Sequence, residues 1–289
     1  MTSHVVDRDE FARVLTEAKG ILASEPSLIM LPSRPTVFVG DTHGDSDSTE
    51  EVFRRFLGSH LIVFEGDYVD RAPATGSSTY NLMGVLQKKV EHPKDVVLLR
   101  GNHEFAELWR YGFQASLDNR DMLVIRPKIL QVMSELPYAA MTPNGVLALH
   151  AGVPNVESLD DIKAVPKGLV LYQENKIACQ LVWNDSLLEG MVNPVGQDFA
   201  PNTKRGFDDD HSIIYGQRFL DEKLAAFGAK VLVRGHDYHA KGHGLNDKIL
   251  TIFTSQEYAK DGPMKGRYVA VLDPAKTIQS TKDLEIVQL

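Results

Sequence analysis

Acidic, amide and imidazole side chains follow three short hydrophobic segments in the first half of the chain. These clusters are Asp41-Thr42-His43-Gly44-Asp45, Gly66-Asp67-Tyr68-Val69-Asp70-Arg71 and Arg100-Gly101-Asn102-His103-Glu104. Carboxylate, amide and imidazole groups together suit a borderline divalent metal ion. Two single histidines, His150 and His236, come after later hydrophobic segments. The chain therefore offers several places that could contribute ligands to one metal site.

Each cluster also has a simpler structural explanation when it is taken alone. Asp41 could cap a turn, and Asn102 could cap a following helix. Asp67 and Arg71 could form a surface pair, although the planar guanidinium of arginine also matches phosphate oxygens. A single histidine at the end of a strand is usually only a polar terminus. The ordered recurrence of all these clusters favours the metal site over a series of independent coincidences.

Hydrophobic, β-branched segments at 36–39, 61–64 and 96–99 predict the strands that carry these clusters. Helical patterns at 48–57 and 77–90 separate the strands. Strand, helix and strand at this spacing form βαβ units, so the strands should be parallel. The three clusters should then meet at the carboxyl edge of one sheet, where α/β proteins bind ligands.

The rest of the chain predicts a second sheet packed on the first. Thr142-Pro143-Asn144-Gly145 separates hydrophobic segments 138–141 and 146–149, which is typical of a β-hairpin. An amphipathic helix is expected at 9–23, after which Pro26, Pro32 and Pro35 lead into the first strand. The further elements expected are strands at 230–233, 249–253, 268–272 and 284–287, and a helix at 217–227.

Composition excludes several other classes of protein. The 289 residues are 43% hydrophobic and carry a net charge of −8, without a run of basic residues. We therefore expect an ordered protein that does not bind nucleic acid. Cys179 is the one cysteine, which excludes an intrachain disulfide and fits a reducing compartment. Neither a signal peptide nor a membrane span is recognisable, so a cytoplasmic location without membrane association is expected, and the oligomeric state stays open.

The motifs GDTHGD, GDYVDR, RGNHE, HAG and RGH occur in the order that resembles the PPP family of metal-dependent phosphoprotein phosphatases. This group includes the type 1 and type 2A serine/threonine phosphatases and the symmetrical diadenosine tetraphosphate hydrolases. The resemblance extends from about residue 36 to 258. It implies the α/β fold of calcineurin-like metallophosphoesterases, in which two mixed β-sheets pack together between helices in four αββα layers. Residues 36–289 would form a single catalytic domain, with 1–35 as a helical segment packed on it.

The resemblance also implies two divalent metal ions, with Mn²⁺ expected and Fe or Zn²⁺ as alternatives. Asp67 would bridge the two ions, and hydroxide held between them would attack phosphorus directly. The remaining ligands would be Asp41 and His43 for one ion and Asn102, His150 and His236 for the other. For the substrate, Arg71 and Arg205 would hold the phosphoryl oxygens, with Asn102 and Tyr258 beside them. His103, oriented by Asp70, would protonate the leaving oxygen.

The expected substrates are phosphoserine and phosphothreonine in proteins, with phosphotyrosine as a further class. Tyr258 and the segment Trp183-Asn184-Asp185 resemble the protein phosphatases, although Ala72, Glu257 and Ala259 depart from the family pattern. An alternative is a hydrolase of diadenosine tetraphosphate, which would share the metals and arginines. A catalytically inactive relative that only binds is a third hypothesis, and the complete set of expected ligands argues against it.

Overall fold

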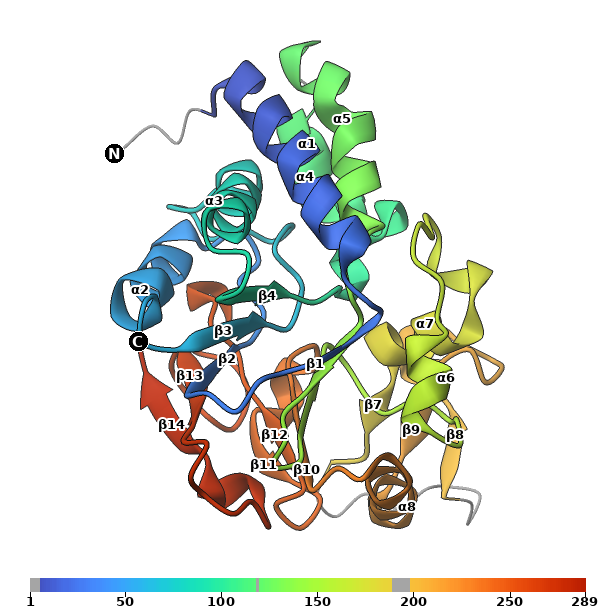
Figure 1. Ribbon diagram of the computed structural model, residues 1–289. Coiled ribbons are helices and arrows are strands. Elements are labelled where there is room, and N and C mark those ends of the chain that lie inside the picture. The colour runs from blue at the N-terminus through green and yellow to red at the C-terminus, as the bar shows by residue number, and fades with distance from the viewer. Residues whose placement is uncertain (1–5, 118–119, 189–197) are drawn as a thin grey trace.

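The computed structural model describes residues 6–117, 120–188 and 198–289, and two mixed β-sheets form its centre (Figure 1). The five-stranded sheet has the order β14-β13-β2-β3-β4, and the six-stranded sheet has the order β1-β5-β6-β10-β12-β11. The strands of the first sheet are β2 (Thr36–Val39), β3 (Leu61–Phe64), β4 (Val96–Leu98), β13 (Tyr268–Leu272) and β14 (Glu285–Gln288). Those of the second are β1 (Leu28–Met30), β5 (Ala139–Met141), β6 (Val146–Leu149), β10 (Val231–Arg234), β11 (Gly242–Gly244) and β12 (Ile249–Thr251).

Helices cover the outer faces of both sheets. Beside the five-stranded sheet lie α1 (Arg8–Ser24), α2 (Ser46–Phe56), α3 (Ser78–Glu91), α4 (Phe113–Leu117) and α5 (Arg120–Met133). Beside the six-stranded sheet lie α6 (Leu159–Lys163), α7 (Lys176–Trp183) and α8 (Gln217–Phe227). A small third sheet has the order β7-β9-β8 and consists of β7 (Asp185–Ser186), β8 (Phe199–Pro201) and β9 (Ile213–Tyr215).

The predicted βαβ arrangement is confirmed. β2 pairs in parallel with β3, and β3 with β4, while α2 and α3 form the connections. The predicted hairpin is confirmed too, since β5 and β6 are antiparallel and Ala140 faces Ala148. β10 is parallel to β6, so the residues after these two strands leave the sheet at the same edge.

Alternation along the strands explains why the two sheets pack together. Phe38 belongs to the core between the sheets, with Ala148 and Val233 from the six-stranded sheet. Its neighbours Val37 and Val39 point the other way and pack with the helices. A fully buried phenylalanine of this kind contributes about 3–5 kcal/mol relative to alanine. The predicted four-layer αββα fold is therefore confirmed, with α2 and α3 on one flank and α6 to α8 on the other (Figure 1).

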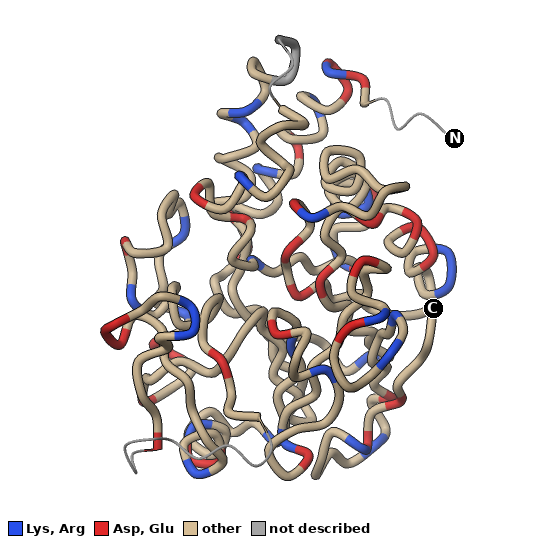
Figure 2. Tube along the Cα trace, turned by 180° about the vertical axis from the view of Figure 1, so that it is seen from behind, with Lys and Arg blue, Asp and Glu red and all other residues tan. Residues whose placement is uncertain are grey.

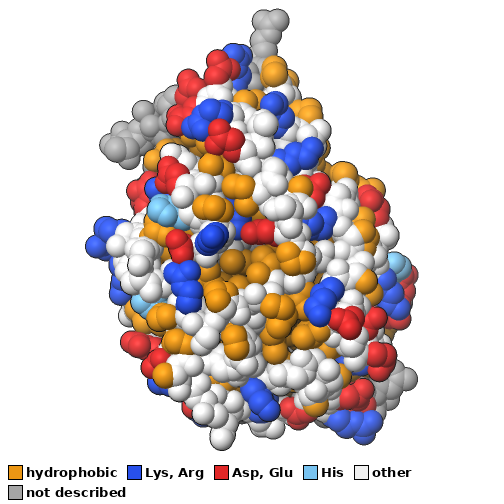
Figure 3. Space-filling model, viewed as in Figure 1, with side chains coloured by type: hydrophobic (Ala, Val, Ile, Leu, Met, Phe, Trp, Pro, Cys, Tyr) orange, Lys and Arg blue, Asp and Glu red, His pale blue; other side chains and the backbone are white. Residues whose placement is uncertain are grey.

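The N-terminal segment differs from prediction in one respect. Helix α1 is where it was expected, but the first strand is not at residue 36, because β1 precedes it and pairs in parallel with β5. Pro26 and Pro32 confine β1 to an edge strand of three residues, which is too short to show a pattern. Met30 on this edge is 56% exposed. Figure 3 shows hydrophobic side chains gathered in the middle of the face seen in Figure 1. The separation of 1–35 from the catalytic part remains a prediction.

Two further properties of the described residues concern membranes and charge. Within 6–117, 120–188 and 198–289, helices with the length and apolarity for a membrane span are absent. Lysine and arginine residues lie scattered among acidic residues along the trace (Figure 2).

Candidate metal centre

The polar clusters predicted from the sequence converge at the carboxyl ends of strands from both sheets. Asp41, Asp67 and Asn102 follow β2, β3 and β4 of the five-stranded sheet. His150 and His236 follow β6 and β10 of the six-stranded sheet. All these side chains are buried. The prediction that residues between positions 41 and 236 meet at one place is therefore confirmed.

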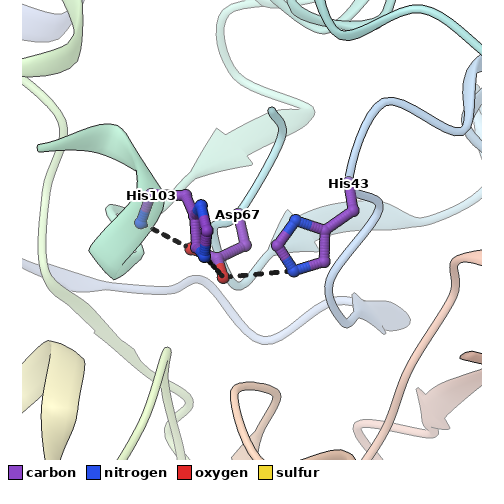
Figure 4. Close-up of side chains that lie close together, drawn as sticks. All are labelled: His43, Asp67 and His103. Atoms are coloured by element: carbon purple, nitrogen blue, oxygen red, sulfur yellow. Dashed lines mark hydrogen bonds and ion pairs between the residues drawn. The ribbon is translucent and has the colours of Figure 1, made fainter. Parts of the chain in front are cut away.

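Asp67 lies at the middle of the cluster. Its Oδ2 is 3.4 Å from Nε2 of His43 and 4.0 Å from Nε2 of His103, and its Oδ1 accepts from the backbone N–H of His103 at 2.9 Å. Figure 4 shows the Asp67 carboxylate between the two imidazole rings. On its other side, Oδ1 is 3.4 Å from Nε2 of His150. One carboxylate thus faces two groups of possible ligands.

His150, His236 and Asn102 form the second of these groups. Nε2 of His150 is 2.8 Å from Oδ1 of Asn102 and 3.2 Å from Nδ1 of His236. The same Asn102 oxygen is 3.1 Å from Nδ1 of His236. Since Nδ1 of His150 donates to the carbonyl oxygen of Glu65 at 3.0 Å, Nε2 of His150 carries a lone pair. That lone pair faces the Asp67 carboxylate at 3.4 Å, so two electron-rich atoms lie close together. A cation between them would offset their repulsion.

The donor set fits divalent metal ions in its electrostatics as well. Burial lowers the pKa of His43, His150 and His236 well below the usual value, which keeps these imidazoles neutral and able to bind a metal. Burial also raises the pKa of Asp41 to about 7 and that of Asp67 well above its usual value. Cations between these carboxylates would offset that cost of burial. His236 presents Nδ1 to the other predicted ligands, while its Nε2 is buried, lacks a hydrogen-bond partner within the described residues and lies 3.7 Å from Oδ1 of Asp185.

Two glycines allow the close approach of backbone to carboxylate. A Cβ on Gly235 would lie 1.9 Å from Oδ1 of Asp41, and a Cβ on Gly101 would lie 2.2 Å from Oδ1 of Asp67. Without that Cβ, the N–H of His236 donates to Oδ1 of Asp41 at 3.1 Å. These glycines therefore let the ends of β10 and β4 come close enough to orient the two aspartates.

His103 is held by Asp70. Nδ1 of His103 lies 2.7 Å from Oδ2 of Asp70, and both side chains are buried. The other oxygen of Asp70 accepts from the N–H of Phe113 at 2.8 Å, which ties the pair to the start of α4. Burial, followed by Arg71 and Arg205, lowers the pKa of His103 well below its usual value. The Asp70 carboxylate, when ionised, opposes that effect by stabilising the imidazolium.

Arg71 and Arg205 both lie near the centre, held by different partners. Nη1 of Arg71 donates to the hydroxyl of Tyr258 at 3.1 Å. Arg205 uses Nε and Nη2 to donate to the two oxygens of Asp185, at 2.8 and 3.2 Å. After burial, the positive charges of both arginines contribute to the low pKa of His103, so both lie near that imidazole. Two cationic guanidinium groups at this position can bind an anion with several oxygens.

A sequence profile described as Calcineurin-like phosphoesterase matches residues 34–240. The chain belongs to this family.

Similar proteins agree with that assignment. A Caenorhabditis elegans protein named as a serine/threonine-protein phosphatase is 29% identical over 86% of this chain and 54% of its own length. Serine/threonine-protein phosphatase T of Trypanosoma brucei brucei is 26% identical over 92% of this chain and 55% of its own length. The chain thus spans about half the length of these curated relatives.

A solved structure supports the fold. It is a protein serine/threonine phosphatase from Saccharomyces cerevisiae with similarity to human phosphatase PP5. The match has a TM-score of 0.82 and 22% sequence identity, and it covers 98% of this chain and 89% of that one. The layers and sheets described above are therefore those of a calcineurin-like phosphoesterase.

Sequence reasoning missed two supporting residues of this calcineurin-like phosphoesterase. The carboxylate of Glu104 accepts from the N–H groups of Asp67, Tyr68 and Gly101, at 2.8, 2.9 and 2.8 Å, and so joins the loops after β3 and β4. Asp185 holds Arg205 and lies 3.7 Å from Nε2 of His236. Glu104 belongs to the RGNHE motif and Asp185 to the segment Trp183-Asn184-Asp185, and this membership was the feature of the sequence that could have indicated their role.

Asp41 and His43 are brought together by a turn and not by extended backbone. In an extended chain, side chains two residues apart would point the same way. His43 instead has a φ of 44°, in the left-handed region. Its Nε2 still comes within 3.7 Å of Oδ2 of Asp41, because the turn rather than a strand brings them together.

Proposed function

We propose that this chain is a metal-dependent phosphoprotein phosphatase that hydrolyses phosphoserine and phosphothreonine monoesters, with phosphotyrosine as a further substrate class. The observation that carries the proposal is the position of Asp67 between two sets of possible ligands. Donor atoms of His43 and His103 gather on one side of it, and donor atoms of Asp41 and His150 on the other. Asp41 also comes within 3.7 Å of His43 and can share an ion with it, while His103 is assigned to proton transfer. A shared carboxylate of this kind suits a pair of metal ions.

In the proposal, Asp41, His43 and Asp67 hold one ion, and Asp67, Asn102, His150 and His236 hold the other. Bound there, two divalent ions would polarise the phosphoryl group and lower the pKa of a coordinated water. The names of the relatives from Caenorhabditis elegans and Trypanosoma brucei brucei support a phosphoprotein as substrate. Manganese as the native metal and a cytoplasmic location remain predictions from the sequence.

The other side chains bind the substrate and move a proton. Arg71 and Arg205 bind the non-bridging phosphoryl oxygens, with Asn102 beside them, and their positive charges stabilise the charge that develops in the transition state. Tyr258 keeps Arg71 in position through its hydroxyl. His103 donates a proton from Nε2 to the leaving oxygen of serine or threonine, while Asp70 holds Nδ1.

The test is a comparison of substrates with metal-loaded protein. Peptides that contain phosphoserine, phosphothreonine or phosphotyrosine are assayed in parallel with diadenosine tetraphosphate, each with Mn²⁺. We expect turnover of the phosphoserine and phosphothreonine peptides, and its loss in Asp67→Asn. Turnover of the dinucleotide alone would refute the proposed substrate class. Full metal-dependent activity in Asp67→Asn would refute the bridging role.

A further inference from the structure

Glu65 is a buried acid for which the proposed chemistry has no use. It follows β3 directly and stands two residues before Asp67. Its side chain is 0% exposed. Neither carboxylate oxygen has a hydrogen-bond partner within the described residues. A carboxylate in this state is costly unless something compensates its charge.

The direction of β3 places the Glu65 side chain between the sheets. Leu61 and Val63 belong to the core between the sheets, and Glu65 continues their alternation. Its N–H donates to the carbonyl oxygen of Val39 at 2.9 Å, so the ladder with β2 extends to this residue. The Glu65 side chain therefore continues the inter-sheet face of β3, at the strand end that Asp67 follows.

The charged groups of the protein do not compensate Glu65. Burial raises the pKa of the Glu65 carboxyl well above its usual value, and the neighbouring Asp41 carboxylate adds to this effect. Arg234 is the cation that acts on Glu65, but its guanidinium already donates to other groups. These acceptors are Thr251 Oγ1, the carbonyl oxygen of Ala151 and Ser186 Oγ. Within the described residues, Glu65 has no ion pair at 4.0 Å or less.

We propose that Glu65 is a supporting carboxylate of the metal centre, whose negative charge strengthens the binding of divalent cations held by Asp41 and Asp67. The missing compensation is then supplied by the cations themselves. Its backbone takes part as well, because the Glu65 carbonyl oxygen accepts from Nδ1 of His150 and directs Nε2 toward the centre. This inference rests on the metal centre of the proposed function.

The experiment measures metal affinity rather than turnover. Glu65→Gln keeps the shape and removes the charge, and Glu65→Leu replaces the acid with an apolar side chain of similar volume. Dissociation constants for Mn²⁺ and Zn²⁺ are determined by competition with a chromogenic chelator. Residues that support ligands typically change metal affinity by about 10–100-fold. We expect a weakening in that range in both variants.

A second measurement separates a metal role from a packing role. Unfolding by urea in the presence of a chelator should show Glu65→Leu to be more stable than the natural protein, because a buried carboxyl group without a hydrogen-bond partner has been removed. The gain in stability on adding Mn²⁺ should be smaller in that variant. A Glu65→Leu variant that is less stable without metal would overturn the inference.

Two controls make the outcomes distinct. Glu25→Gln removes another acid with one buried, unpartnered oxygen, located after α1 and away from the centre, and should leave metal affinity unchanged. Asp67→Asn should lose metal binding. If the natural protein binds metal and both Glu65 variants bind within twofold of it, or if only Glu65→Leu is weakened, the inference on Glu65 is wrong. If the natural protein binds no divalent metal, the proposed function fails instead.

Discussion

Replacing Asp70 with asparagine should impair hydrolysis selectively when the leaving group is poor. Asp70 has a φ of 64°, a conformation that asparagine also tolerates, so the backbone should be unchanged. Its Oδ1 accepts from the N–H of Phe113 at 2.8 Å, so an asparagine would keep its oxygen there. The amide nitrogen would then face Nδ1 of His103, which in the natural protein lies 2.7 Å from Oδ2 of Asp70. The variant donates to the imidazole where the natural protein accepts from it.

The size of the effect follows from the charge of this contact. A hydrogen bond to a charged group contributes about 1.5–3 kcal/mol. A factor of ten in rate corresponds to about 1.4 kcal/mol, so the loss in kcat/KM should be about 10–150-fold for a phosphoserine peptide. Burial raises the pKa of Asp70 to about 7, opposed by the N–H of Phe113 and by Arg71. Since ionised Asp70 stabilises the imidazolium, its removal lowers the pKa of His103.

The assay compares a phosphoserine peptide with p-nitrophenyl phosphate, whose leaving group needs little protonation. We expect the large loss with the peptide alone, and the alkaline limb of its pH profile should move to lower pH. Asp161→Asn, which alters a cap of α6, is the control for an unspecific effect of the substitution. Equal losses with both substrates would show that Asp70 does not act through a proton on His103.

Three further predictions concern Asp185, the bound metal and Cys179. Asp185→Asn should raise the KM for a phosphopeptide about tenfold with a smaller change in kcat, because Arg205 loses its bidentate partner; an unchanged KM in steady-state kinetics would contradict this. Removing metal should lower the Tm, since a ligand at 100 times its Kd contributes about 2.7 kcal/mol, or roughly 4–5 °C in a protein of 289 residues; scanning calorimetry of Asp67→Asn should show no such difference. Cys179→Ala should retain full activity and metal content, because burial raises the pKa of the Cys179 thiol and so disfavours a nucleophilic thiolate. It should lose about 1 kcal/mol of stability, because the side chain is fully buried. Loss of turnover in the folded variant would contradict direct hydrolysis without a cysteine phosphoenzyme.

The sequence predicted the central parts of the fold well because their hydrophobic patterns are strong. The strands at β2, β3 and β6 are continuous hydrophobic segments buried on both faces, and their positions were found to the residue. Helix α5 was missed, and Pro127 lies inside it, where proline opposes a helix. Strand β7 has only two residues, so it could not show a period. Short or interrupted elements depend on tertiary contacts that a local pattern does not contain.

For the site, residue types and strand ends were sufficient to predict which possible ligands lie together, but not to find the residues that support them. Glu104 binds backbone N–H groups of the neighbouring loops, and Asp185 binds the guanidinium of Arg205. The role of each acid therefore depends on distances between segments that are far apart in sequence. The same holds for Glu65, which stands where a hydrophobic segment would continue. Its importance follows from the lack of a partner, which only three-dimensional structure shows.

The backbone at the centre shows why these residue types occur together. Among the described residues with positive φ other than glycine are His43, Asp67, Asp70, Arg71 and His236, all predicted for the site. Aspartate and histidine tolerate the left-handed region better than most residues, and both residue types can bind divalent metals. Arg71 lacks that tolerance, so its conformation has to be stabilised by contacts. The N–H of Arg71 donates to the carbonyl oxygen of Tyr111 at 3.0 Å, and its side chain donates to Tyr258. Strained backbone concentrated in this way is typical of a functional site, because only the surrounding structure can maintain it.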